Sequence, residues 1–242
     1  MFAEIQQWER QRLGRFTNSE NHKLFVSGSR PMTDEELRIE KENKGKRKTV
    51  TTTFGQTALT YINEKISELM TGVPCRDLTG MKQLEWGAAN EYEAAMELIK
   101  QTKIDFEIYG GSNNIFLPLN EYSGGSPDAL STEVCAEIKC PYNSSIHISN
   151  LIASKKRHSN EWMKEYRFDY YVQIQGNMMA ANINNYELLN KGLFVSFDPR
   201  MLDPKNRLAI IRIEKDEEIQ QELKMRIDKA AEIVSEAIEI LT

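Results

Sequence analysis

Apolar residues recur every three or four positions over several long stretches of the chain. This spacing places them on one face of an α-helix. The stripe is clearest near the C-terminus, where Ile219, Leu223 and Ile227 follow one another. The pattern predicts helices over residues 54–70, 81–101, about 169–181 and about 216–241, of which the last is the longest. It also predicts a helix and turn around Trp8 before residue 24, and helical pieces within residues 145–165.

Shorter apolar runs bounded by glycine pairs predict β-strands. These runs cover residues 104–109, 115–119, 128–130, 133–139, 193–197 and 208–213. This order of helices and strands predicts an α/β or α+β fold, with a central mixed β-sheet flanked by helices. Because 242 residues are enough for one sizeable core, we expect a single domain spanning residues 1–242.

Residues 26–53 differ from the rest of the chain in having little apolar periodicity. The segment is polar, it is interrupted by Gly28, Pro31 and Gly45, and it includes a lysine-rich stretch. Glycine and proline at such intervals are typical of loops. We therefore expect residues 26–53 to form a mobile polar loop or insertion.

Composition narrows the class of protein. No apolar run approaches the ~20 residues of a membrane span, and the polar first residues do not resemble a signal peptide, so we expect a cytoplasmic protein without a membrane partner. The three cysteines and three histidines lack metal-ligand spacing, which disfavours zinc and a disulfide framework.

The net charge of −5 disfavours a nucleic-acid partner at first sight. Acidic residues are concentrated after Glu214, however, so basic clusters upstream remain compatible with DNA binding on one face.

The candidate chemistry lies in Ser126-Pro127-Asp128 and in Glu137-Ile138-Lys139. Alternate side chains of a strand share a face, so Glu137 and Lys139 should point together while Ile138 enters the core. Asp128, presented by the preceding turn, can close on them. Two carboxylates hold a hard cation such as Mg²⁺, and a lysine beside them can orient or deprotonate water. The alternative is a strand that carries only a surface ion pair.

Two predicted helices carry polar residues that belong to the same hypothesis. Glu91 lies among small and aromatic residues that indicate a packed helix face, and Glu93 must then point elsewhere. Gln173 lies on the helix predicted near residue 169, where its amide can donate to a phosphate or to a water. The alternatives are a solvated glutamate and a surface amide.

Taken together, these motifs resemble the lambda-exonuclease family, also called YqaJ-like viral recombinases, within the PD-(D/E)xK nuclease superfamily. The similarity extends over nearly the whole chain in the same order. The residues that match the family are Arg12-Leu13-Gly14 with Thr17 and Ser19, Trp86-Gly87 followed by Glu91, Ser126-Pro127-Asp128, Glu137-Ile138-Lys139-Cys140-Pro141, Gln173 with Gln175, and Asp198-Pro199-Arg200-Met201.

The resemblance implies a restriction-endonuclease-like core and assigns roles within it. Asp128, Glu137 and the main-chain carbonyl of Ile138 would ligate Mg²⁺, or Mn²⁺ in its place, with one or two ions in the site. Glu91 would support the site directly or through water, and Lys139 would position or activate the attacking water.

The resemblance also implies a reaction and partners. Gln173 would help to fix the water, and Arg12 and Ser19 match positions that bind the 5′-phosphate of a DNA end. The reaction would be 5′-to-3′ digestion of one strand of linear double-stranded DNA by a ring-shaped homotrimer. The 3′ single-stranded tail would pass to a single-strand annealing protein. The alternatives are an endonuclease or junction resolvase with the same site, and a catalytically silent scaffold that binds DNA ends.

Overall fold

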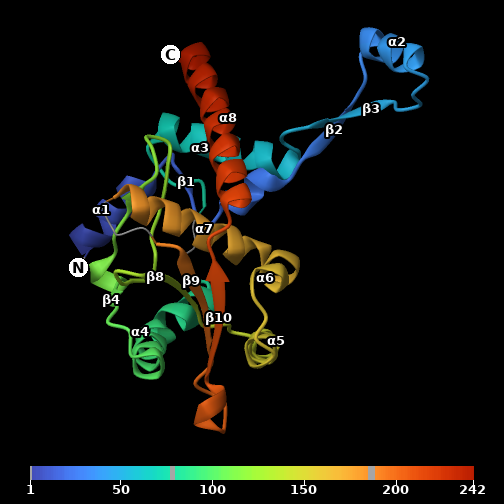
Figure 1. The fold of residues 1–242 in the computed structure, drawn as a ribbon. Helices are drawn as coiled ribbons and strands as arrows, with labels where there is room; N and C mark the ends of the chain where they lie inside the picture. Colours follow the sequence, from blue (N-terminus) through green and yellow to red (C-terminus); the bar gives the residue numbers. More distant parts are fainter. Residues whose placement is uncertain (1, 77–79, 185–188) are drawn as a thin grey trace.

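A five-stranded mixed sheet forms the centre of the computed structural model, which describes residues 2–76, 80–184 and 189–242 (Figure 1). The strand order is β10-β9-β8-β7-β4. Strands β8 and β9 are parallel, and the other neighbours are antiparallel. The bounds are β4 Glu107–Ile108, β7 Ala129–Leu130, β8 Val134–Lys139, β9 Lys191–Phe197 and β10 Leu208–Glu214. A mixed sheet flanked by helices was the predicted fold class, and it is confirmed.

Helices cover both faces of this sheet. On one face, α4 (Lys82–Thr102) packs Ala95 and Leu98 against Ile138 of β8. On the other face, α7 (Phe168–Ile183) packs Ile174 against Cys135 and Phe194. Helix α5 (Ser144–Lys155) contacts β10 and β9, and α6 (Asn160–Tyr166) joins it to α7. Strand β8 is therefore enclosed between two helices, and its alternate side chains enter two different cores.

A third core joins the N- and C-terminal parts of the chain. Helices α3 (Gln56–Thr71) and α8 (Glu217–Leu241) pack together around Tyr61 and Leu223. Beside them, a three-stranded sheet has the order β1-β6-β5. The bounds of the remaining N-terminal elements are α1 Phe2–Arg12, β1 Phe16–Thr17, η1 Asn21–Phe25, β5 Leu117–Pro118 and β6 Ser123–Gly125. This core fixes the N-terminal segment against α7.

The predicted long helices agree with the observed ones to within a few residues, because their apolar stripes face the cores just described. The expected strands at 104–109 and 115–119 are shorter, since only two residues of each pair with a neighbour. Strands β1 and β6 were not predicted, because a pairing of two residues leaves no apolar alternation in the sequence. No helix among the described residues is long and apolar enough to cross a membrane.

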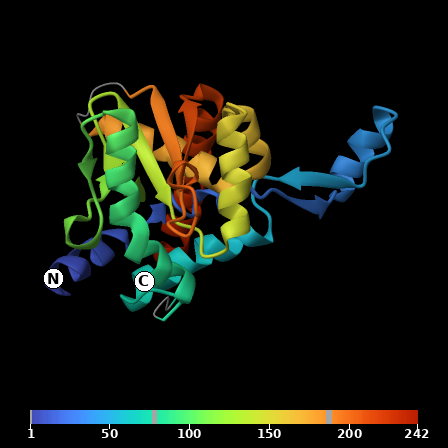
Figure 2. The same ribbon diagram turned by 90° about the horizontal axis from the view of Figure 1, so that it is seen from below.

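Residues 26–53, which were expected to form a mobile polar loop or insertion, contain regular structure. Strands β2 (Gly28–Pro31) and β3 (Thr49–Thr52) pair antiparallel, and α2 (Asp34–Glu42) lies between them. This arm projects from the body of the molecule in both views (Figures 1 and 2). Its strands are polar because they face solvent, and α2 begins with a capping box between Thr33 and Glu36. The mobility of this segment remains a prediction.

Candidate active site

Strand β8 presents Glu137 and Lys139 on the same face, and it sends Ile138 into the core beneath α4. Glu137 is completely buried, and its Oε1 lies 2.5 Å from Nζ of Lys139. Lys139 is partly exposed and lies over the ring of Tyr170. The pair is thus a buried ion pair at the end of a central strand, and the alternative of a surface ion pair does not hold.

Asp128 directly precedes β7 and lies next to strand β8. Its Oδ2 accepts a hydrogen bond of 2.6 Å from the main-chain N–H of Ile138. Strand β7 ends before it reaches Ile138, so the Asp128 carboxylate takes the place of a strand partner. The N–H and C=O of a strand residue point toward the same edge. The Ile138 carbonyl therefore faces the side of the sheet on which Asp128 lies.

Glu91, on α4, lies close enough to Asp128 for the two carboxyl groups to interact electrostatically. Burial, together with the negative charge of Asp128, raises the pKa of Glu91 to about 8. Burial and Asp128 likewise raise the pKa of Glu137 to about 8, although Lys139 acts in the opposite direction. Asp128 is therefore the centre of three interacting carboxyl groups. Such a cluster gains free energy when a cation, or a proton, offsets its charge.

Two amide side chains from α7 hold Glu137 in place. Gln173 Nε2 donates to Oε1 at 2.6 Å, and Asn177 Nδ2 donates to Oε2 at 3.1 Å. Both amides are buried, so the alternative of a surface Gln173 does not hold. Asn177 was not predicted. Its position four residues after Gln173, one helical turn along the same face, was the available signal.

Arg12 and Ser19 lie together at a separate cavity of about 720 Å³ between α1 and α3. Arg12 Nη2 is 3.5 Å from Ser19 Oγ, which is 3.2 Å from Thr17 Oγ1. In the described part of the chain, no carboxylate lies within ion-pair distance of the Arg12 guanidinium. A charged side chain beside two hydroxyls can receive a phosphate.

Trp8 connects this cavity with the carboxylates. Its indole Nε1 donates to Ser126 Oγ at 3.0 Å, and the Arg12 guanidinium lies 4.3 Å from the centre of its ring. Ser126 directly precedes Pro127 and Asp128, so the cavity borders the turn that presents Asp128. The structure therefore brings the predicted DNA-end residues next to the predicted metal residues.

The donor set suits a hard cation such as Mg²⁺. Carboxylate and carbonyl oxygens are its preferred protein ligands. Among the residues that the structure describes, no three Asp, Glu, His or Cys side chains are arranged to bind one ion together. The predicted set requires only two carboxylates, Asp128 and Glu137, and a main-chain carbonyl. The observation that supports the fit is the bond from the Ile138 N–H to Asp128, which places that carboxylate beside the main chain that carries Glu137 and the Ile138 carbonyl.

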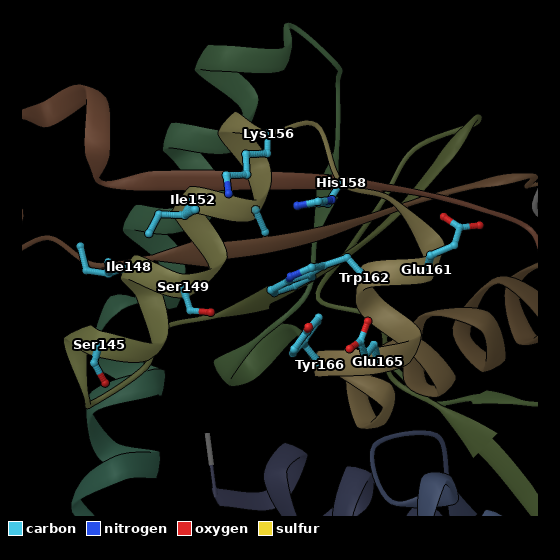
Figure 3. Close-up of a pocket in the computed structure, with 11 residues that line it drawn as sticks. Ser145, Ile148, Ser149, Ile152, Lys156, His158, Glu161, Trp162, Glu165 and Tyr166 are labelled. Atoms are coloured by element: carbon cyan, nitrogen blue, oxygen red, sulfur yellow. The ribbon is translucent and has the colours of Figure 1, made fainter.

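A second hollow, of about 690 Å³, lies between α5 and α6 (Figure 3). Ile148 and Ile152 line it from α5, and Trp162 and Tyr166 point into it from α6. The described residues predicted for the site, from Arg12 to Gln173, do not line this hollow. It is therefore distinct from the carboxylate cluster.

The sequence and the structure of this chain are similar to those of known proteins. The family model of the YqaJ-like viral recombinase domain matches residues 7–184. An alkaline exonuclease from Laribacter hongkongensis has a similar structure, with a TM-score of 0.70 and 22% sequence identity over 98% of this chain and 95% of that one. The same values apply to that enzyme in complex with dAMP.

A phage related exonuclease from Haemophilus somnus 129PT is also similar in structure. Its TM-score is 0.62, with 16% identity over 94% of this chain and 96% of that one. A search of the curated proteins found no match. These likenesses support the fold of the whole chain, including the parts outside residues 7–184.

Proposed function

Because this chain belongs to the family of YqaJ-like viral recombinase domains, we propose that it is a 5′-to-3′ exonuclease. Its substrate is linear double-stranded DNA, from which it releases 5′-mononucleotides and leaves a 3′ single-stranded tail for strand annealing. The observation that carries this proposal is the position of Asp128, which accepts a hydrogen bond from the Ile138 N–H and so lies beside the Glu137–Lys139 pair. We expect the reaction to take place in the cytoplasm of a bacterial cell or of a phage-infected host.

Asp128, Glu137 and the carbonyl of Ile138 would hold one or two Mg²⁺ ions, and Mn²⁺ could replace Mg²⁺. Glu91 would support the site directly or through water. Bound Mg²⁺ would neutralise charge on the scissile phosphate and lower the pKa of water. The protein contributes the placement of these ligands, because Asp128 is bonded to the main chain of Ile138, the residue after Glu137, and α4 brings Glu91 close to Asp128.

Lys139 acts in this proposal as a cation and not as a base. Burial lowers its pKa, but the carboxylates of Glu137 and Asp128 outweigh burial and raise the pKa above its usual range. An ammonium group that stays protonated can orient the attacking water and stabilise the negative charge that develops on the phosphate. Gln173, on α7, donates to Glu137 Oε1 and so helps to hold the carboxylate in place beside Lys139.

The cavity beside Arg12 and Ser19 supports an exonuclease over an endonuclease or a junction resolvase. Arg12 and Ser19 would bind the terminal 5′-phosphate, and Trp8 holds α1, which carries Arg12, against the turn that carries Asp128. A homotrimer that encircles the duplex would let this acidic chain bind DNA, because only the channel of the ring must be basic. The product tail would pass to a single-strand annealing protein.

The test is a digestion time course on linear duplex labelled at the 5′ or the 3′ end, with Mg²⁺ or with a chelator, beside a covalently closed circle. We expect release of 5′-mononucleotides only from linear DNA with Mg²⁺. Cutting of the circle would indicate an endonuclease. Binding of ends without digestion would indicate a silent scaffold.

A further inference from the structure

A row of three buried asparagines connects the N-terminal segment to Glu137. Asn21 Nδ2 donates to Asn18 Oδ1 at 3.1 Å, and Asn18 Nδ2 donates to Asn177 Oδ1 at 3.0 Å. Asn177 Nδ2 then donates to Glu137 Oε2 at 3.1 Å. At most 1% of the surface of each asparagine is exposed, so water cannot replace these hydrogen bonds.

The backbone around this row leaves room for it at two glycines. A Cβ atom at Gly125 would lie 2.2 Å from the side chains of Asn18 and Asn177. A Cβ atom at Gly176 would lie 2.6 Å from the Asn18 amide. Asn18 therefore occupies a space that exists only because Gly125 of β6 and Gly176 of α7 have no side chain.

The direction of every hydrogen bond in the row follows from Glu137. Glu137 must be ionised to hold a cation, and an ionised carboxylate can only accept, so Asn177 must turn its NH₂ group toward it. The Asn177 carbonyl then faces Asn18, which must present its own NH₂ group. The row therefore has one polarity, and a change at Asn18 can reverse the Asn177 amide without touching Glu137.

We propose that Asn18 and Asn177 are positioning residues that fix Glu137 in the orientation that binds the divalent cation. This inference rests on the proposed function for the metal site. Asn18 directly precedes Ser19, so the row also joins the segment that contacts the DNA end to the metal ligand. Partners that orient a ligand typically contribute about 10–100-fold to metal affinity.

The substitution Asn18→Asp tests the polarity of the row. The new carboxylate can only accept, so Asn177 must turn its NH₂ group toward residue 18 and its carbonyl oxygen toward Glu137. We expect Mn²⁺ binding, measured by electron paramagnetic resonance, to weaken about tenfold or more. Excess Mg²⁺ should restore much of the DNA digestion rate, whereas a purely structural defect would persist.

Two further variants complete the experiment. Asn18→Ser introduces no charge, and its shorter side chain loses the amide NH₂ that reaches Asn177, so we expect weaker Mn²⁺ binding in the same direction even if Asn18→Asp fails to fold. Asn150→Asp is the matched control, because Asn150 is equally buried but bonds to Ser196 and Arg167. Its Mn²⁺ affinity should stay within about twofold of the unmodified protein.

The outcomes separate the inference from the proposed function. Wild-type Mn²⁺ affinity in folded Asn18→Ser would overturn the positioning role, as would equal losses in Asn18→Ser and Asn150→Asp. If the unmodified protein binds Mn²⁺ but does not digest DNA, the proposed function fails. The comparison of Mn²⁺ affinities then still decides the role of the asparagine row.

Discussion

The Oδ2 atom of Asp128 accepts a 2.6 Å hydrogen bond from the main-chain N–H of Ile138. Because an aspartate side chain replaces a neighbouring strand at this point, the sheet opens where its carboxylates gather. The same bond determines where Asp128 lies relative to Glu137, the residue before Ile138. A single side-chain-to-backbone contact thus joins the beginning of strand β7 to the proposed metal site.

Replacing Asp128 with Asn should abolish Mg²⁺-dependent digestion and preserve the fold. The Asn side-chain oxygen can still accept from Ile138, whereas the negative charge required for the metal is lost. We expect the digestion rate to fall by about 10³-fold or more, since catalysis through the metal depends on this ligand. Circular dichroism should remain native.

Asp203→Asn provides the control for the Asp128 variant. Asp203 also accepts from a main-chain N–H, that of Lys205 at 3.0 Å, but it lies on the exposed β9–β10 connection. Its digestion rate should equal that of the unmodified protein. Digestion at the normal rate by Asp128→Asn would show that the site is assigned wrongly.

Without divalent metal, stability should fall as the pH rises from about 5 to about 8. Glu91 and Glu137 have pKa values near 8 in the folded protein, against an ordinary value of 4.5. Between these limits the folded state holds protons that the unfolded state has released, so the free energy of unfolding decreases with pH. Mg²⁺ should oppose the decrease, because it binds the ionised carboxylates.

Urea unfolding at several pH values, in chelator and in Mg²⁺, measures this effect. His22 contributes with the opposite sign, since burial lowers its pKa. The Asp128→Asn variant isolates the cluster, because His22 is unchanged in it while the repulsion on Glu91 and Glu137 is removed. Parallel pH profiles of the two proteins in chelator would contradict the contribution of Asp128 to the raised pKa values of Glu91 and Glu137.

Local sequence patterns could predict only the part of the site that lies within single elements. The two-residue period of a strand placed Glu137 and Lys139 together, and the helix periodicity placed Gln173 on α7. Asn18 and Asn177 escaped prediction because they meet across 159 positions of the chain. Strand β1 contains two residues and β2 has no apolar side, so neither produces the alternation from which strands are predicted.

Gln173 and Gln175 should differ in their roles although both are buried on α7. Gln173 donates to Glu137, so Gln173→Ala should lower the digestion rate by about 10–100-fold and raise the Mg²⁺ requirement. Gln175 instead bonds to Glu214, Asp216 and Gln220. Gln175→Ala should cost about 1–3 kcal/mol of stability, because it leaves buried polar groups without partners.

Digestion at saturating Mg²⁺ and urea unfolding, applied to both glutamine variants, test this division of roles. Each variant serves as the control for the other, since both remove a buried amide from the same helix. Equal effects on rate and on stability in the two variants would contradict it.

Arg12→Gln should weaken recognition of a 5′-phosphorylated end. The guanidinium, stacked on Trp8 and 3.5 Å from Ser19 Oγ, offers charged donors that glutamine lacks. We expect the KM for 5′-phosphorylated duplex to rise about tenfold, equivalent to roughly 1.4 kcal/mol. The KM for a 5′-hydroxyl duplex should change little, because that end carries no terminal phosphate.

Steady-state digestion of the two duplexes measures the preference directly. Arg10→Gln is the matched control, since Arg10 lies on the same helix but is exposed and lines a different hollow, beside Gly14 and Tyr122. It should retain the preference for a 5′-phosphate. An Arg12→Gln variant that still distinguishes the two ends as the unmodified protein does would place the 5′-phosphate outside the cavity of Arg12 and Ser19.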